Sequence, residues 1–219
     1  MPTNVAAKRD KSGPRKWVRR AEARPEEILD AALEEFTEKG FDAARMEDIA
    51  RRAGLSKAGV YLYFESKEAL LKALIEAKIA PIAQNAQLIA QAGAADPINA
   101  MKLLGRAAIA RFADPKVFAV PRLVIGLSAR FPEFAEYYRT QAVEVARQAL
   151  ESLVAAAIAR GEFRDVEPHA AVRALIGPIL FEAMWTHVLR GENGFAAPET
   201  LIEQHFDVLL RGLAKERTS

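Results

Sequence analysis

Prolines and glycines divide this chain into helix-length segments, and this punctuation limits most strongly what it can fold into. Apolar residues inside the segments recur at helical spacing, and no segment alternates valine, isoleucine and threonine with polar residues as a strand does. Proline suits the first turn of a helix, because the N–H that it lacks would have no partner there. Prolines stand before helix-favouring stretches at Pro25, Pro97, Pro115, Pro132, Pro168 and Pro198. The sequence therefore predicts an all-α chain of about nine helices.

Residues at the ends of the segments support these boundaries. Asp96 and Asp114 each precede one of the prolines, where a carboxylate can accept the free N–H groups of a first helical turn. Glycines fall where the apolar periodicity stops, the usual place for a left-handed residue that closes a helix: Gly40, Gly93, Gly161 and Gly191. Both signals favour helices separated by short turns.

Three helices are predicted at the N-terminal end. The first covers about residues 25–39 and the second about residues 46–53. Gly54 makes the turn after the second helix, and Ser56 can cap the third, about residues 57–63, through its hydroxyl. The apolar side chains expected to face inward are Ile28, Leu29, Ala32, Leu33, Phe36, Met46, Ile49, Ala50, Ala53, Val60 and Phe64.

A fourth helix is predicted over about residues 67–92. Ser66 can cap it, and Pro81 should kink it. Its leucine-rich face is expected to cover the first three helices with Leu70, Leu71, Leu74 and Ile75.

The second and third helices form a helix-turn-helix pattern, in which the N-terminal part of the later helix enters the major groove of DNA. Gly59 is unexpected inside so short a helix, because glycine costs roughly 1 kcal/mol relative to alanine there. An early helix end or tight packing against a neighbouring helix would explain it. The alternative is that the backbone must approach a ligand closely, as it would at base edges.

Other residues near Gly59 have the chemistry for DNA contact. Lys57 and Ala58 share the first turn of the helix, where small neighbours let the backbone come close to bases. Tyr61 and Tyr63 offer hydroxyls to phosphates, although either could be partly buried instead. Lys67 adds a cation at the start of the next helix.

Residues 28–75 resemble the DNA-binding domain of the tetracycline-repressor (TetR) family of bacterial transcription regulators. The motifs that carry the resemblance are "AALEEFTEKGF", "IARRAGLSKAGVYLYF" and "SKEALL", in the family's order and spacing. Family members are homodimers whose two recognition helices read a palindromic operator in double-stranded DNA. The resemblance implies that Ser56, Lys57, Ala58 and Gly59 lie at or near bases, and that Tyr61, Tyr63 and Lys67 lie at phosphates.

This chain departs from the family pattern at three places. Ala44 and Arg45 stand where members often carry threonine or serine, so the hydroxyl cap is lost, and Arg45 could supply a charged phosphate contact instead. Gly59 replaces a frequent threonine or alanine, and Leu62 cannot hydrogen-bond. Lys57 is therefore the main candidate for direct base readout, with guanine as the candidate base.

Residues 1–24 are predicted to be a flexible basic arm beside the DNA-binding domain of residues 25–75. The arm carries eight basic and two acidic residues, a net charge of +6, while the whole chain is +2. With a helix-turn-helix beside it, the arm is expected to contact DNA rather than remain a solvated tail, and a minor groove is the candidate site.

Residues 76–219 are predicted to bind an effector and to dimerise. The resemblance to the family is one of layout here, over residues 97–215. Two helices, about 132–160 and 168–190, are expected to form the dimer interface, and the second is apolar nearly all round. The candidate interface residues are Ala142, Ala146, Ala149, Leu153, Ile176 and Leu180.

An effector pocket is expected between helix 67–92 and the C-terminal helices. Residues of these types are more often ordinary core or surface, and a histidine on an apolar helix is more often a satisfied core histidine than a ligand. The candidates for an unidentified small apolar or aromatic effector are Gln84, Arg106, Phe112, Phe118, Phe134, Phe181, Met184, Trp185 and His187.

Composition and motifs exclude several classes of protein. With 51% hydrophobic and 27% charged residues, the chain is expected to be globular, and zero cysteines exclude disulfides and thiolate metal sites. No stretch approaches about 18 consecutive apolar residues, and no signal-peptide core is present, so we expect a cytoplasmic protein without a membrane span.

An enzyme is not expected. The histidines have no carboxylate at Glu-x-x-His spacing, and neither a phosphate-binding glycine loop nor a nucleophile elbow occurs. The sequence thus predicts no catalytic residues, no metal and no cofactor. Two rival functions stay open: a helical interaction protein that does not bind DNA, and an architectural DNA-binding protein without an effector.

Overall fold

The computed structural model describes residues 15–191 and 198–215. Within these ranges it contains eleven α-helices and one π-helical turn, η1, with an isolated backbone bridge between Phe163 and Ala214. In chain order the elements are α1 (Arg15–Lys39), α2 (Met46–Arg52), α3 (Lys57–Tyr61), α4 (Lys67–Lys78), α5 (Ala80–Ala92), α6 (Pro97–Phe112), α7 (Pro115–Leu127), α8 (Pro132–Tyr138), η1 (Arg139–Val143), α9 (Glu144–Ala159), α10 (Pro168–His187) and α11 (Pro198–Leu213).

The predicted all-α fold is confirmed, and two of the expected helices are subdivided. The helix expected over residues 67–92 is α4 followed by α5, and the one expected over residues 132–160 is α8, η1 and α9. Counting each set as one helix gives the nine expected in the described part. The break between α4 and α5 falls at Ile79 rather than at Pro81, because a proline ring disturbs the helical turn that precedes it.

Proline marks the start of five helices as predicted, and Pro25 is the exception. Helices α6, α7, α8, α10 and α11 each begin at their proline. Pro25 lies inside α1, which starts at Arg15, so residues 15–24 are helical and not part of a flexible arm. Residues 1–14 of the predicted arm lie outside the described residues, and its contact with DNA stays a prediction.

The predicted caps are largely confirmed. The side chains of Asp96 and Asp114 accept from backbone N–H groups in the first turns of α6 and α7. Gly40 and Gly161 have positive φ angles of 81° and 72°, as expected for glycines that close helices. Gly93 has φ −90°, so the prediction of a left-handed closing residue is wrong there.

The C-terminal end of α10 also differs from the prediction. Here the residue with positive φ is Arg190, not Gly191. Gly191 is required for another reason: a Cβ at this position would collide with the indole ring of Trp185. The glycine therefore allows close packing of the ring and not a left-handed turn.

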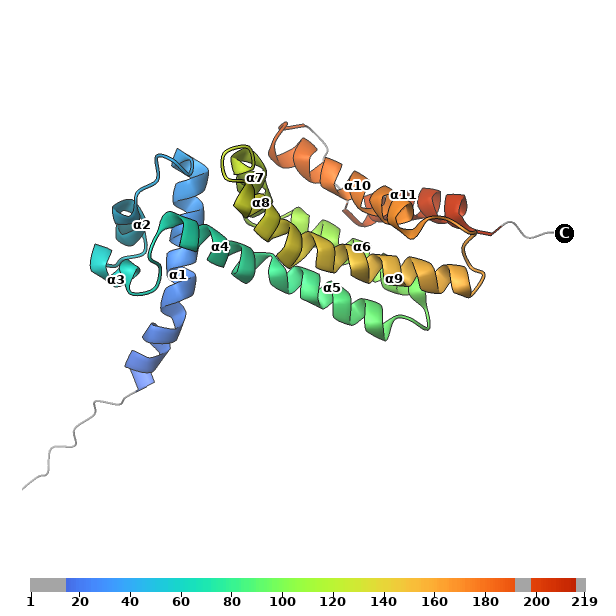
Figure 1. Ribbon diagram of the computed structural model, residues 1–219, viewed down its shortest axis with the longest axis horizontal. Coiled ribbons are helices and arrows are strands. Elements are labelled where there is room, and N and C mark those ends of the chain that lie inside the picture. Colours follow the sequence, from blue (N-terminus) through green and yellow to red (C-terminus); the bar gives the residue numbers. More distant parts are fainter. Residues whose placement is uncertain (1–14, 192–197, 216–219) are drawn as a thin grey trace, which may run out of the picture.

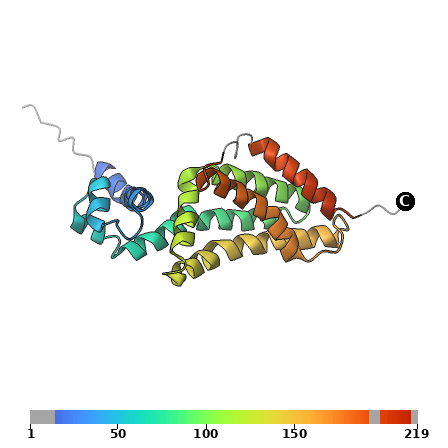
Figure 2. The same ribbon diagram turned by 90° about the horizontal axis from the view of Figure 1, so that it is seen from above.

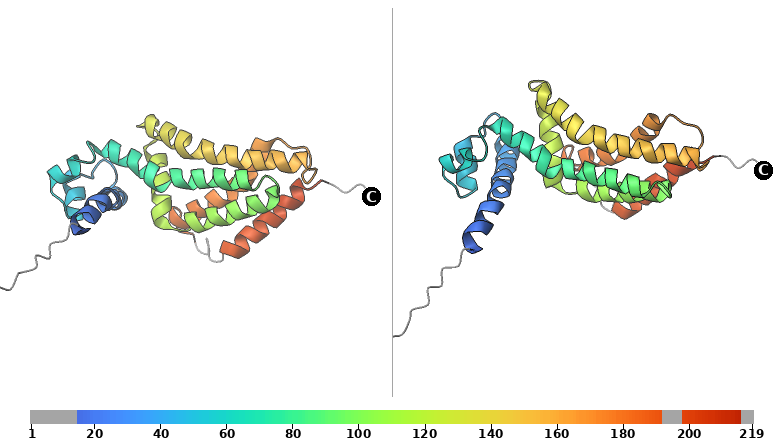
Figure 3. Two further views of the ribbon diagram at one scale, coloured as in Figure 1. Left: turned by 90° about the horizontal axis from the view of Figure 1, so that it is seen from below. Right: turned by 60° about the horizontal axis from the view of Figure 1, so that its bottom comes forward.

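Helices α1–α4 form the head of the molecule, and α5–α11 form an elongated bundle. Figure 1 shows α2 and α3 at one end and the C-terminal helices at the other. Views from above and below place α9 and α11 on opposite sides of the bundle (Figures 2 and 3). Helix α4 leads from the head toward the bundle, where α5 packs against α9.

The head and the bundle do not have fully separate cores. The first buried cluster, which we call the head core, combines head residues such as Phe36, Ile49 and Val60 with residues of α7 and α8. Phe41 in the head makes edge contacts with Phe131 and Phe134, each at 5.9 Å between ring centroids. Helices α7 and α8 therefore support the head directly.

A second buried cluster fills the remainder of the bundle, from α5 and α6 to α9, α10 and α11. Leu153 and Ala157 of α9 are almost fully buried in it, as are Val172 and Leu175 of α10. In the described residues, no helix is both long and apolar enough to cross a membrane.

Candidate nucleic-acid interface

Ser56 fixes the start of α3. Its hydroxyl accepts from the backbone N–H of Gly59 at 3.1 Å, which satisfies one of the free donors of the first turn, as predicted. A Cβ at position 59 would lie 3.3 Å from that hydroxyl oxygen, which is shorter than an ordinary van der Waals contact. The capping contact therefore gives Gly59 a structural reason in addition to the close approach to DNA that the sequence suggested.

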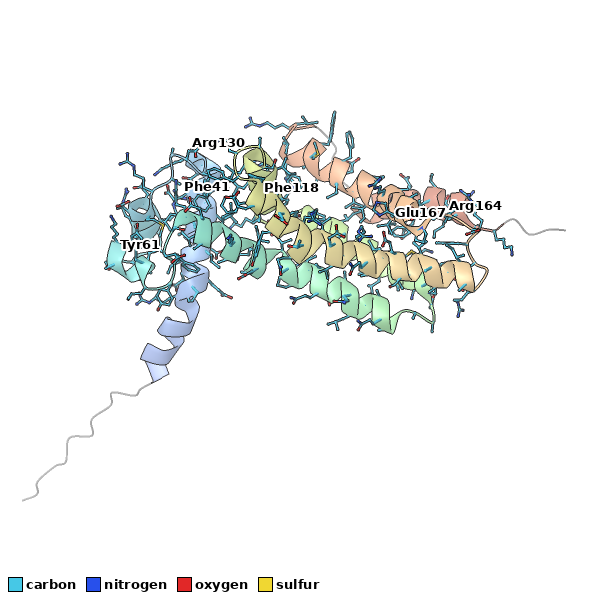
Figure 4. All side chains as sticks on the ribbon, viewed as in Figure 1. Phe41, Tyr61, Phe118, Arg130, Arg164 and Glu167 are labelled. Carbon is cyan, nitrogen blue, oxygen red and sulfur yellow. The ribbon has the colours of Figure 1, made fainter. Side chains whose placement is uncertain are left out.

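One face of α3 anchors the helix and the other is exposed. Val60 is fully buried in the head core, so it holds the short helix in place. Tyr61 and Tyr63 are 44% and 43% exposed, and Leu62 is 84% exposed. Neither tyrosine is thus a core residue, and Figure 4 shows Tyr61 at the outer end of the head.

Lys57 is exposed on the first turn of α3 but has a partner. Its Nζ lies 2.5 Å from Oε1 of Glu47, at the start of α2, and 5.8 Å from the centroid of the Tyr61 ring. The hydrogen bond with Glu47 raises the pKa of Lys57 and lowers the pKa of Glu47. Sequence reasoning missed Glu47, because no local pattern links a residue of α2 to one of α3.

Arg45 and Lys67, both predicted at phosphates, lie in different environments. Arg45 is exposed immediately before α2, and its side chain makes no capping hydrogen bond, as the loss of the hydroxyl implied. Lys67 donates to the carbonyls of Phe41 and Asp42 at 2.7 and 3.1 Å, and its Nζ lies 4.9 Å from the centroid of the Phe41 ring. Lys67 therefore holds the turn between α1 and α2, and a phosphate contact would use its third N–H.

A network of ion pairs fixes α2 against α1. Glu35 is 3% exposed and lies 3.0 Å from Nε of Arg52 and 2.8 Å from Nζ of Lys39. The same Arg52 guanidinium also pairs with Glu34 and Glu38. The orientation of the helix-turn-helix therefore depends on charges that sequence reasoning did not single out, although glutamates at helical spacing in "EEFTEK" and the pair "RR" are the signal that could have found them.

Helices α2 and α3 thus have the geometry of a helix-turn-helix whose second helix is capped, anchored in the core and exposed on its outer face. Comparison with known protein families supports this assignment. Residues 28–74 match the profile of "Bacterial regulatory proteins, tetR family", and residues 99–197 match "Tetracyclin repressor-like, C-terminal domain". This chain belongs to the TetR family. It is a transcriptional regulator with a DNA-binding helix-turn-helix.

Individual TetR-family relatives are similar over different lengths. The uncharacterized HTH-type transcriptional regulator YdeS of Bacillus subtilis (strain 168) is 28% identical over 161 residues, 73% of this chain and 77% of YdeS. YvdT of the same strain is 49% identical over 51 residues, which span 23% of this chain and only 26% of YvdT. A crystal structure of a TetR-family protein from Mesorhizobium loti MAFF303099 has a TM-score of 0.70 at 25% identity and covers 88% of this chain and 96% of that chain.

The residues proposed for an effector pocket do not form one group in this TetR-family chain. Phe112, Phe118 and His187 do meet: the Phe118 ring lies 6.3 Å from the Phe112 ring and 5.5 Å from the His187 ring. His187 is partly buried, and its Nε2 lies 2.8 Å from the carbonyl oxygen of Phe112, so the ring has a hydrogen-bond partner within the chain. Phe134 belongs instead to the head core.

The other proposed pocket residues point elsewhere. Phe181, Met184 and Trp185 are 56%, 43% and 39% exposed on the outer face of α10, and Gln84 is exposed on α5. Arg106 lines an open hollow of about 590 Å³ between α6 and α11, together with Lys102, Glu203, Phe206, Asp207, Leu210, Arg211 and Ala214. Phe134 therefore lies in the head core, and Phe181, Met184 and Trp185 lie on the outward face of α10, so the structure does not bring these four together with the other candidates.

The proposed interface residues divide in the same way. Ala142, Ala149 and Leu153 are buried in the chain's own cores, so they are not available to a partner subunit. Ala146 and Ile176 are partly buried against those cores, and Leu180 is 40% exposed. The assignment of Ala142, Ala149 and Leu153 needs correction, because helical periodicity marked the inward face of η1 and α9 and not the outward face.

Proposed function

We propose that this chain is a homodimeric regulator that binds a palindromic operator, acts as a repressor without a catalytic step, and is released by a small apolar or aromatic effector. One observation carries the proposal: the first turn of α3 is exposed at the outer end of the head, capped by Ser56 and bearing Lys57. Ala58 and Gly59 add little bulk beside the ammonium, so the backbone can approach base edges. Lys57 can donate there to guanine O6 and N7.

The outward face of α10 supports the dimer. Opposite the core, α10 and its C-cap residue carry large apolar side chains that are 39–56% exposed: Leu180, Phe181, Met184, Trp185 and Val188. Helix α9 packs beside α10 and contributes Ser152 and Ala155, two small exposed residues. A second copy related by twofold symmetry would remove this apolar surface from water. Two α3 helices would then lie one or more DNA turns apart.

The ring cluster of Phe112, Phe118 and His187 supports the effector site. These residues come from α6, α7 and α10, so a flat apolar molecule inserted among the rings would displace α7. Helix α7 contributes Val120 and Val124 to the head core and packs on α1 and α4. Effector binding at this ring cluster would therefore shift the head through α7. It would also shift the head by bending the chain at the break between α4 and α5.

The energy needed for release is modest. An effector that prefers the released conformation about 100-fold contributes roughly 2.7 kcal/mol per site. Two sites in a dimer would supply about twice that free energy, enough to empty an operator of ordinary affinity.

Titration of DNA from the region upstream of the protein's own gene tests the proposal. That fragment should bind much more tightly than a shuffled fragment, with two subunits per site and an affinity that falls steeply with salt. Lys57→Ala should reduce the discrimination at one base pair by about tenfold or more. Equal affinity for both fragments at every salt concentration would favour the architectural rival, and no DNA binding would favour the interaction protein.

A further inference from the structure

Glu47 and Lys57 form an ion pair across the turn of the helix-turn-helix. Glu47 is the second residue of α2, Lys57 is the first residue of α3, and Oε1 and Nζ are 2.5 Å apart. Both side chains are about half exposed, and the Tyr61 ring also faces the ammonium. The pair thus lies on the surface that the proposed function turns toward base edges.

Both partners stay charged over a wide range of pH. Their mutual hydrogen bond lowers the pKa of Glu47 and raises the pKa of Lys57, and the nearby charge of Arg45 lowers the pKa of Glu47 further. The carboxylate is therefore a permanent negative charge at a surface that DNA phosphates must approach.

The other cations of these two helices are also paired with carboxylates. Arg51 pairs with Asp48, three residues earlier in α2. Arg52 pairs with Glu34, Glu35 and Glu38 of α1. Helices α2 and α3 consequently present neutralised cations, which weakens the general attraction to phosphates on which non-specific binding depends.

We propose that Glu47 is a positioning residue that makes Lys57 selective for one base pair, an inference that rests on the proposed function. A phosphate of random DNA that binds the Lys57 ammonium must also come close to the Glu47 carboxylate, which repels it. Guanine presents no such conflict, because its O6 and N7 accept from lysine and, unlike a phosphate, carry no formal negative charge. Glu47 supplies the repulsive element that specificity often needs.

Four variants separate this role from a general effect of charge: Glu47→Gln, Lys57→Ala, the double variant, and Glu27→Gln. Glutamine keeps the shape of glutamate, and Glu27 is exposed on α1, so the last variant removes an equal charge away from α3. The probes are a duplex that the wild-type protein selects from a randomised library and a shuffled duplex of the same composition. Affinities are measured by fluorescence anisotropy at several salt concentrations, and thermal unfolding verifies that each variant is folded.

Glu47→Gln should bind the shuffled duplex about threefold more tightly, the strength of an ordinary surface ion pair. It should steepen the salt dependence by about one phosphate contact and lower the preference for G·C at one position. In the Lys57→Ala background, Glu47→Gln should change base preference no further.

Two results would overturn the inference. If Glu47→Gln matched Glu27→Gln in salt dependence and base preference, Glu47 would have no positioning role, although the proposed function would stand. If the wild-type protein selected no sequence at all, the proposed function would fail, and the inference with it.

Discussion

Gly177 offers the sharpest test of the proposed dimer. It lies on the outward face of α10, where a Cβ would meet nothing within 4 Å in the single chain. Gly177→Glu should therefore leave the subunit folded. Glutamate is also a better helix former than glycine, so the substitution stabilises α10 itself by up to about 1 kcal/mol. Ile176→Asp would be a poorer test because Ile176 packs on the chain's own core.

Gly177→Glu should weaken the dimer strongly, because twofold symmetry places one new carboxylate from each subunit at the interface. A carboxylate removed from water without a partner costs several kcal/mol, taken here as about 3 kcal/mol per subunit. Two such groups cost about 6 kcal/mol, which raises the dimer dissociation constant by roughly 10⁴-fold.

Sedimentation velocity over a range of concentrations measures this constant, and thermal unfolding verifies the subunit. Gly212→Glu on α11 is the matched control, since a Cβ there also meets nothing within 4 Å. Gly177→Glu should give folded monomers at concentrations where the wild type and the control are dimers. An unchanged dimer in both variants would refute the assignment of this face.

Three further predictions concern stability. Phe41→Ala should lower the free energy of unfolding by about 3–5 kcal/mol, and hydrogen exchange should accelerate in α8 as well as in α1, because both pack on this ring. Arg52→Ala should lower the unfolding temperature of the head more than Arg51→Ala, because only the first removes a partner of the buried Glu35. Burial raises the pKa of Tyr138 to about 12, so the unfolded chain loses this proton first as pH rises. The free energy of unfolding should thus fall by about 2 kcal/mol between about pH 10 and 12, and Tyr138→Phe should reduce that loss in urea titrations.

The head could be predicted from the sequence because its signals are local. Ser56 and Ser66 each accept from a backbone N–H three residues later, as their positions before helical segments implied. All the inward-facing residues predicted for α4, Leu70, Leu71, Leu74 and Ile75, are fully buried. Periodicity and capping act within a few residues, so sequence reasoning reaches them.

Contacts between distant segments could not be predicted in the same way. Lys67 looked like a free cation, yet its hydrogen bonds go to carbonyls in the turn between α1 and α2. Phe134 looked like a pocket residue, yet it completes the head core. Pro25 looked like a first-turn proline, although α1 runs through it. None of these outcomes follows from local spacing, because each depends on how the helices pack.

The C-terminal candidates show a second limit of sequence reasoning. Helix α10 is apolar nearly all round, and apolarity alone does not distinguish core, pocket and subunit interface. The structure resolves part of this ambiguity: Leu175 is buried in the chain's own core, whereas Phe181 is 56% exposed. The proposed dimer depends on that outward face.

Selection of binding sites from a library of randomised duplexes tests the central claim most directly. The wild-type protein should enrich an inverted repeat whose half-sites are centred one or more DNA turns apart, because a twofold dimer presents α3 twice. The enriched duplex should bind two subunits with an affinity that falls steeply with salt. Enrichment of a single unrepeated half-site, or no enrichment at all, would contradict the claim that paired α3 helices read an operator.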